Sequence, residues 1–258
     1  MAVSDRTRNI AVAVTAVAQL VVGLGAQFLL DPDSSTAAIS DDNRSPLTPA
    51  GYAFSIWGLI FTACLALAAY QALPAQRERA VHRRTGWWLV AAFTASAIWV
   101  PIFSTGVLWL AQLVILVLLG CLVVAARRLT RLGPAPDRTE QLALRLPVTI
   151  YLGWVSLATV AGFGATFRWF GMPARGGWVS LVAAVLLLFA TAFAIVVVGR
   201  FLAVAGFALA ACWALVALAI GTSSDVVRVT AVVAGLLVLA VLVLRARNSR
   251  RPATVLLG

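Results

Sequence analysis

Residues 48–61, TPAGYAFSIWGLIF, decide the fold class of this chain. They follow an acidic loop and open a long apolar segment. Pro49 suits the first turn of a helix, where its missing N–H loses no helical partner, and Thr48 can cap the free amides of that turn. Three aromatic residues follow within two turns: Tyr52, Phe54 and Trp57. Aromatic residues at the start of an apolar helix are typical of an interfacial anchor, so the stretch predicts a membrane-spanning helix.

The composition of the whole chain supports this interpretation. Of its 258 residues, 62% are hydrophobic, and the mean hydropathy is +0.98, whereas soluble domains are about half apolar. Apolar runs of about 20 residues recur, each long enough to cross about 30 Å of hydrocarbon. A segment in lipid must satisfy its own backbone polar groups, which favours helices. We predict an all-α, polytopic transmembrane bundle of about eight helices.

The predicted spans begin after a short basic N-terminus. They cover about 10–30, 49–73, 86–103, 107–126, 147 onward, 178–198, 201–220 and 226–244. The first run resembles a signal peptide, but no small-residue cleavage site ends it, so we expect a retained helix. The loop at 31–47 is acidic and long enough to lie over the bundle as a lid.

Charge is divided unevenly between the predicted loops. The net charge is +11, and all 20 basic residues are Arg. Sixteen lie near the termini or in alternate loops, and the exceptions are Arg44, Arg168, Arg175 and Arg228. This positive-inside bias predicts a multi-pass protein of the cell (inner or plasma) membrane with both termini in the cytoplasm. Because the membrane topology accounts for the distribution of the arginines, the positive charge does not indicate a nucleic-acid partner, and we expect none.

The predicted membrane core holds no Asp, Glu, Lys, Arg or His. Such residues usually mark proton relays and ion-coupled transport, and acid–base or covalent catalysis relies on them. We therefore predict no catalytic residue and no metal site, and consider a binding protein more favoured than an enzyme. His82, the single histidine, lies in an Arg-rich loop, where we expect it to be solvated. The three cysteines lie one each in three apolar segments, where a free cysteine packs as a small apolar side chain.

Three segments carry ordered aromatic motifs. Residues 49–61 place Trp57 and Phe61 after Pro-x-Gly-Tyr-x-Phe, residues 95–103 (ASAIWVPIF) contain Trp99 and Phe103, and residues 151–159 read YLGWVSLAT. This order resembles the second, third and fifth helices of the TspO/translocator-protein family, the tryptophan-rich sensory proteins. The chain departs from the family pattern in each motif. In the first, Ala50 replaces one Pro of a pair, and the gap from Phe54 to Trp57 is one residue shorter. In the second, Ser96 and Val100 replace an Asn and a Ser, and in the third, Gly162 replaces a final Asn.

The resemblance implies a five-helix membrane unit at 1–167, with three additional transmembrane helices at 168–258. It also implies a shared ligand pocket, built from Tyr52, Phe54, Trp57, Trp99, Phe103, Tyr151, Trp154, Ala158 and Thr159. The family binds porphyrins and related tetrapyrroles. No cofactor is required, and without an intramembrane histidine a possible porphyrin ligand would be held by stacking rather than through iron.

Alternatives remain at the level of the site and of the function. Ala158, Gly162 and Thr166 form a small-residue face, which serves close helix packing as well as a flat ligand slot. The leading hypothesis is a membrane protein that binds or senses a planar hydrophobic small molecule. One alternative, implied only by the resemblance, is an enzyme that degrades porphyrins. Another is a structural or partner-binding protein, such as a homo-oligomer, that uses its last three helices.

Overall fold

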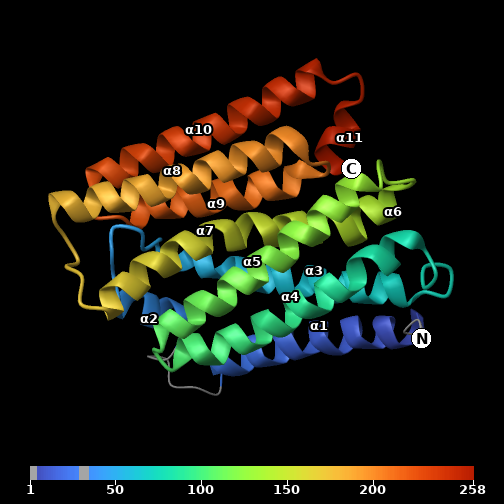
Figure 1. The fold of residues 1–258 in the computed structure, drawn as a ribbon, viewed down its shortest axis with the longest axis horizontal. Helices are drawn as coiled ribbons and strands as arrows, with labels where there is room; N and C mark the ends of the chain where they lie inside the picture. The colour runs from blue at the N-terminus through green and yellow to red at the C-terminus, as the bar shows by residue number, and fades with distance from the viewer. Residues whose placement is uncertain (1–4, 29–34) are drawn as a thin grey trace.

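The computed structural model describes residues 5–28 and 35–258, and within these ranges the chain is helical without strands (Figure 1). Eight long helices of the described residues form the bundle: α1 (Asp5–Phe28), α3 (Ile56–Ala72), α4 (Ala80–Ser104), α5 (Leu108–Arg131), α7 (Leu146–Trp169), α8 (Gly177–Arg200), α9 (Val204–Gly221) and α10 (Asp225–Asn248). The short elements are α2 (Thr36–Asp42), the 3-10 turn η2 (Gly51–Ser55), α6 (Arg138–Glu140), the π-helical turn η3 (Gln141–Arg145) and α11 (Pro252–Leu257). Residues 29 and 30 of the first predicted span lie outside the described ranges.

The predicted membrane bundle is confirmed. Seven helical segments in the described part of the chain are long and apolar enough to cross a membrane: the one formed by η2 and α3, α4, α5, the one formed by α6, η3 and α7, α8, α9 and α10. Helix α1 has 24 residues and packs along α4 and α3. The long helices run in alternating directions, so both termini lie at the same end of the bundle (Figure 1). The protein is therefore a multi-span membrane protein in contact with lipid.

The start of α3 and α4 differs from the sequence prediction. Thr48 does not cap a helix, because its hydroxyl instead accepts a hydrogen bond from the backbone N–H of Ser45 (2.9 Å). Helix α4 begins at Ala80 rather than at residue 86. This earlier start places His82 inside the helix on its packed face, where it is fully buried and its ring meets that of Tyr70 edge-on at 5.6 Å. The expectation of a solvated histidine was therefore wrong.

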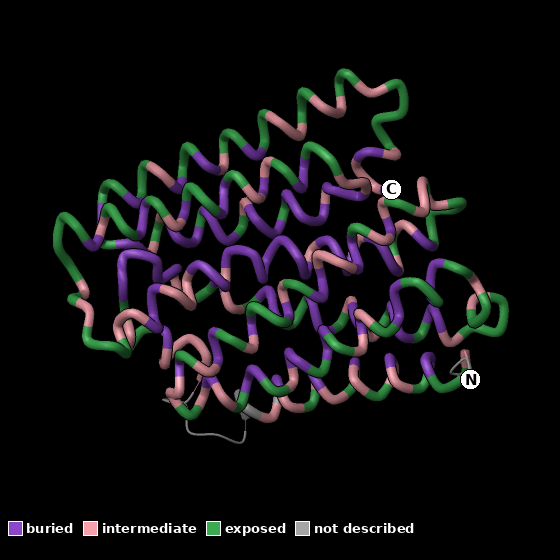
Figure 2. Tube along the Cα trace, in the orientation of Figure 1, coloured by how far each residue is buried: buried purple, intermediate pink, exposed green. Residues whose placement is uncertain are grey.

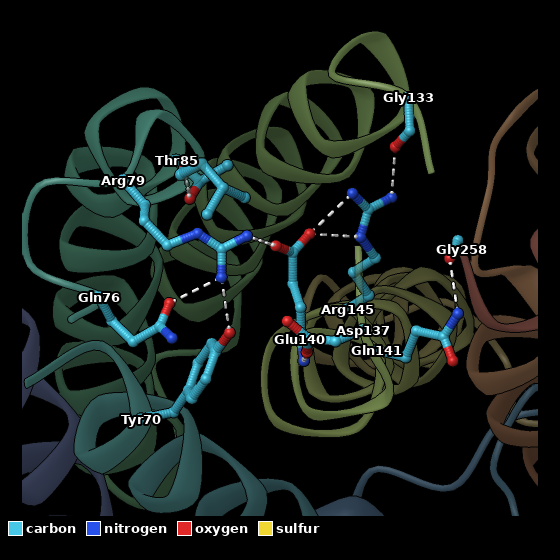
Figure 3. A network of polar contacts seen from close by, with 11 residues as sticks. Tyr70, Gln76, Arg79, Thr85, Gly133, Asp137, Glu140, Gln141, Arg145 and Gly258 are labelled. Atoms are coloured by element: carbon cyan, nitrogen blue, oxygen red, sulfur yellow. Dashed lines mark hydrogen bonds and ion pairs between the residues drawn. The ribbon is translucent and has the colours of Figure 1, made fainter. Parts of the chain in front are cut away.

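A buried ion-pair network joins the elements at the end that carries the termini (Figure 3). The Glu140 carboxylate accepts hydrogen bonds from Arg79 (2.5 Å) and from Arg145 (2.8 and 3.0 Å). The side chains of Glu140 and Arg145 are each only 2% exposed. Arg145 also donates to the carbonyl of Gly133, and Gln141 donates to the carbonyl of Gly258. A buried charge needs such partners, so this network fixes α4, η3 and the C-terminal segment against one another.

The last three helices differ in how deeply they are packed. Helix α9 lies against α7 and η2, and Phe207 in it is fully buried. Helices α8 and α10 lie on the outer side of the bundle, and most of the surface of α10 is exposed (Figure 2). Helix α9 therefore belongs to the interior of the bundle, whereas α8 and α10 present apolar side chains to the surrounding lipid.

Candidate functional site: an aromatic slot between five helices

A narrow cavity, here called the slot, lies in the half of the bundle away from the termini. Its walls come from η2, α3, α4, α5, α7 and α9, and its volume is about 40 Å³. A cavity needs roughly 10–15 Å³ per water molecule on this measure, so the slot has room for about three waters. The lining residues used below are Ser40, Leu47, Pro49, Phe54, Trp57, Trp99, Phe103, Gln112, Trp154, Ala158, Gly162, Ala214 and Leu218.

Trp57 is at the centre of the aromatic wall. Its ring lies 5.5 Å from that of Trp99 at an interplanar angle of 31°, and 6.0 Å from that of Trp154 at 86°. Phe103 continues the wall from Trp99 at 4.8 Å, and Phe54 meets Trp154 edge-on at 6.1 Å. Offset and edge-to-face pairs at these separations are the favoured aromatic geometries. Rings from η2, α3, α4 and α7 thus form one connected aromatic cluster, and each of these five residues lines the slot.

The position of Trp57 depends on the winding of η2. The gap from Phe54 to Trp57 is three residues, which in an α-helix leaves the two side chains about 60° apart on the helix circumference. Phe54 lies in a 3-10 turn, where each residue rotates the chain by about 120° instead of about 100°. The tighter turn brings both rings toward the same side, so both line the slot despite the shorter gap.

Three buried polar atoms of slot residues have no hydrogen-bond partner in the described structure: Nε1 of Trp57, Nε1 of Trp154 and Oε1 of Gln112. These side chains belong to residues that are at most 5% exposed. The Gln112 amide is held on its other side, because Nε2 donates to the carbonyl of Thr159 (3.2 Å). Leaving a buried donor or acceptor unsatisfied costs about 1–3 kcal/mol. The residues that line the slot therefore carry two N–H donors and one carbonyl acceptor that lack a partner.

Gly162 makes room for this amide. A Cβ at Gly162 would lie 2.2 Å from Gln112 Oε1, which is far inside van der Waals contact. The fifth-helix motif of the resembled family ends in Asn at this place, whereas here a glycine leaves space for an amide that comes from α5. The polar group of the slot is thus supplied by a different helix from the one the motif predicts.

The segment 43–50, here called the strap, forms part of the wall of the slot. Leu47 and Pro49 line the cavity, together with Ser40 from α2. The strap is attached to the end of α9, since the N–H of Ala50 donates to the carbonyl of Ala217 (2.9 Å) and the hydroxyl of Thr222 donates to that of Pro46 (2.7 Å). Part of the predicted lid, residues 31–34, lies outside the described ranges.

Six of the nine residues predicted to form the pocket line the slot: Phe54, Trp57, Trp99, Phe103, Trp154 and Ala158. The other three do not line it. Tyr52 is 44% exposed and packs edge-on against Trp213. The Tyr151 ring lies behind Trp57, with its hydroxyl donating to Gln19 (3.2 Å). The Thr159 hydroxyl donates to a carbonyl of its own helix. Whether any of the nine contacts a ligand stays a prediction.

The sequence analysis missed Gln112 and the contribution of α9. Gln112 is the single amide in the apolar run at 107–126, which was a usable signal. Ala214 and Leu218 line the slot from α9, but an Ala- and Val-rich run gives no sign of which face is internal. No group of three His, Cys, Asp or Glu side chains that could hold a metal ion occurs in the described part of the chain.

Comparison with protein families agrees with this architecture. A family model described as TSPO-like protein matches residues 9–244. The chain belongs to the TSPO-like protein family. The match runs from α1 into α10, so it includes the last three helices of this TSPO-like protein as well as the first five. Comparisons with curated proteins and with solved structures gave no match. The division into units at 1–167 and 168–258 stays a prediction.

Proposed function

We propose that this TSPO-like protein binds a planar, hydrophobic small molecule in the slot, and that the ligand is a tetrapyrrole such as a porphyrin. The observation that carries the proposal is the cluster of Trp57, Trp99 and Trp154, which come from three helices and line one cavity. Ring faces hold flat apolar molecules by stacking. The porphyrin class comes from the family resemblance, and the site chemistry is compatible with it.

The unpartnered atoms define what such a ligand should carry. Two indole N–H groups, on Trp57 and Trp154, would each gain a partner from an acceptor such as a carboxylate or a carbonyl oxygen. The Gln112 carbonyl would gain one from a donor such as a pyrrole N–H. A purely hydrocarbon ligand would leave all three unsatisfied at a cost of about 1–3 kcal/mol each. A planar ligand with polar atoms at its rim is therefore favoured over a sterol.

A tetrapyrrole is much larger than the three waters for which the slot has room, so binding must widen it. The strap is the element best placed to move, because it is the non-helical segment in the wall of the slot. Its described tethers to the end of α9 are a few hydrogen bonds, involving Arg44, Pro46 and Ala50. Ligand entry would break these bonds while the helices stay packed. Binding and release would then both depend on opening of the strap.

The experiment is a titration of the purified protein in lipid nanodiscs with a small panel of ligands. Protoporphyrin IX, an open-chain tetrapyrrole and cholesterol are compared by quenching of intrinsic tryptophan fluorescence, with free tryptophan as the inner-filter control. We expect saturable 1:1 quenching by the porphyrin, and we expect that an excess of cholesterol, which has no chromophore to quench tryptophan, does not reverse it. Equal or absent quenching by the whole panel would contradict the proposal. Porphyrin absorbance recorded in the light and in the dark separates simple binding from breakdown of the ligand.

We also infer that the Arg-rich end, with both termini, faces the cytoplasm of the inner or plasma membrane. Sixteen arginines belong to the segments at that end, and four to the segments at the other. The slot then opens in the outer half of the membrane, under the strap, so its ligand would enter from outside or from the outer leaflet.

A further inference from the structure

A second hollow lies at the Arg-rich end, far along the bundle from the slot. Its volume is about 290 Å³, and its lining consists of Arg84 on α4 together with Arg128 and Arg131 on α5. Arg84 and Arg131 are exposed and Arg128 is half-buried. None of the three side chains has a carboxylate within ion-pair distance in the described structure. Three guanidinium groups therefore converge on one open space without neutralisation.

Other contacts hold this group in place. The Arg128 guanidinium donates to the carbonyl of Arg84 (2.7 Å) and lies 5.3 Å from the ring centroid of Trp88. This cation–π contact fixes Arg128 at the level of an aromatic residue of the kind that marks the membrane interface. The neighbouring carboxylates of Asp5 and Glu78 pair with Arg83 instead.

Helix electrostatics explain part of the arrangement but not all of it. Arg128 and Arg131 lie in the last turn of α5, where the helix dipole favours positive charge. Arg84 is the fifth residue of α4, beyond the first turn and far from the C-terminal end, so the helix dipole does not favour a positive side chain there. Solvation of separate arginines would not require them to share a hollow, whereas binding of an anion would.

We propose that Arg84, Arg128 and Arg131 form a binding site for a phosphate group at the membrane interface. Arginine pairs with phosphate through two parallel N–H donors, and three such groups match an anion of more than one negative charge. Basic pockets between transmembrane helices hold the head groups of anionic lipids in this way. The phosphate comes either from such a lipid or from a soluble phosphorylated compound, and the two sources are separable by experiment.

The test uses the full-length protein in two arms. In the lipid arm, native mass spectrometry counts the phosphatidylglycerol molecules that stay bound after release from mixed-lipid nanodiscs. In the soluble arm, inorganic pyrophosphate is titrated calorimetrically into protein held in neutral-lipid nanodiscs. The site variant is R84Q/R128Q/R131Q. The control R127Q/R247Q/R250Q removes the same charge from exposed arginines outside the hollow.

We expect bound lipid or pyrophosphate affinity to fall about fivefold for each arginine removed in the site variant, and by less than twofold in total in the control. Loss in the lipid arm alone identifies a head group, and loss in the soluble arm identifies a free phosphate compound; either result supports the site. Equal loss in the site and control variants, or no loss in either arm, overturns it. Because Arg128 also packs on Trp88, R84Q/R131Q repeats the test without disturbing that contact.

Discussion

Replacing Gly221 with alanine should loosen the strap that lines the slot. A Cβ on Gly221 would lie 2.3 Å from the backbone N of Ala50 and 2.5 Å from the backbone carbon of Pro49. Both atoms belong to the main chain, so no side-chain rotation relieves the contact. Ordinary van der Waals separation requires a shift of about 1 Å or more, which strains the hydrogen bond from Ala50 to the carbonyl of Ala217 (2.9 Å).

The size of the effect follows from two opposing terms. Overpacking of a filled site costs about 1–3 kcal/mol, and alanine in place of glycine in a helix returns at most about 1 kcal/mol. The net loss of about 1–2 kcal/mol corresponds to a fall of about 2–8 °C in apparent Tm. If this free energy destabilises only the packed position of the strap, ligand dissociation should become about 5- to 30-fold faster.

The assay combines thermal unfolding of detergent-solubilised protein with stopped-flow release of protoporphyrin IX. Gly120→Ala is the matched control, because Gly120 lies on the exposed face of α5 with nothing within 4 Å of an added Cβ. It should not lower the Tm and should leave release unchanged. An unchanged Tm and release rate in Gly221→Ala would refute the close packing of the strap on α9.

The remaining predictions concern the slot, the ion-pair network and the topology. Trp99→Leu and Trp154→Leu each remove a stacking face but keep apolar bulk, so porphyrin affinity measured by ligand fluorescence should fall about 2- to 12-fold. The control Trp109→Leu lies outside the slot and should change the affinity less than twofold. An equal fall in the control variant would contradict the site. Glu140→Gln leaves its buried arginine partner without a counter-charge and should destabilise the protein by about 3–5 kcal/mol in thermal unfolding. Asp41→Asn in an exposed pair should cost less than about 1 kcal/mol. A similar loss of stability in both variants would show that the buried network is not critical. A reporter fused after α11 should read cytoplasmic and one inserted in α2 external, and a periplasmic C-terminus would reverse the assigned orientation.

Much of the bundle could be predicted from the sequence because lipid imposes strong constraints. A run of apolar residues must be helical and must be about as long as the membrane is thick. The spans and their order could therefore be predicted from the sequence. The ends of helices were not, because they depend on tertiary contacts. Ala80–Thr85 reads as a basic loop, yet it is helical, since His82 and Thr85 pack inside the bundle.

The slot could be predicted only in part from the sequence. Its aromatic residues could be found because their order resembles a family motif, and the 3-10 winding at Phe54 then decides which side of the bundle Trp57 faces. Tyr151 and Thr159 belong to the same motif but lie behind the wall, because their positions on α7 face α1, α3 and the helix itself. No motif signals Leu218, since its place in the wall arises from the packing of α9 against the strap.

Binding of protoporphyrin IX to Ala158→Leu tests the central claim, a flat ligand held in the slot, most directly. Ala158 lines a cavity of about 40 Å³, and a leucine there fills space that the ligand would occupy. Ala66→Leu adds the same bulk to an exposed face of α3 and serves as the control. With both variants folded as judged by gel filtration and thermal unfolding, we expect Ala158→Leu to weaken 1:1 binding more than either tryptophan substitution, by more than about 12-fold, and Ala66→Leu to bind like the wild type. Wild-type affinity in a folded Ala158→Leu protein would contradict the claim.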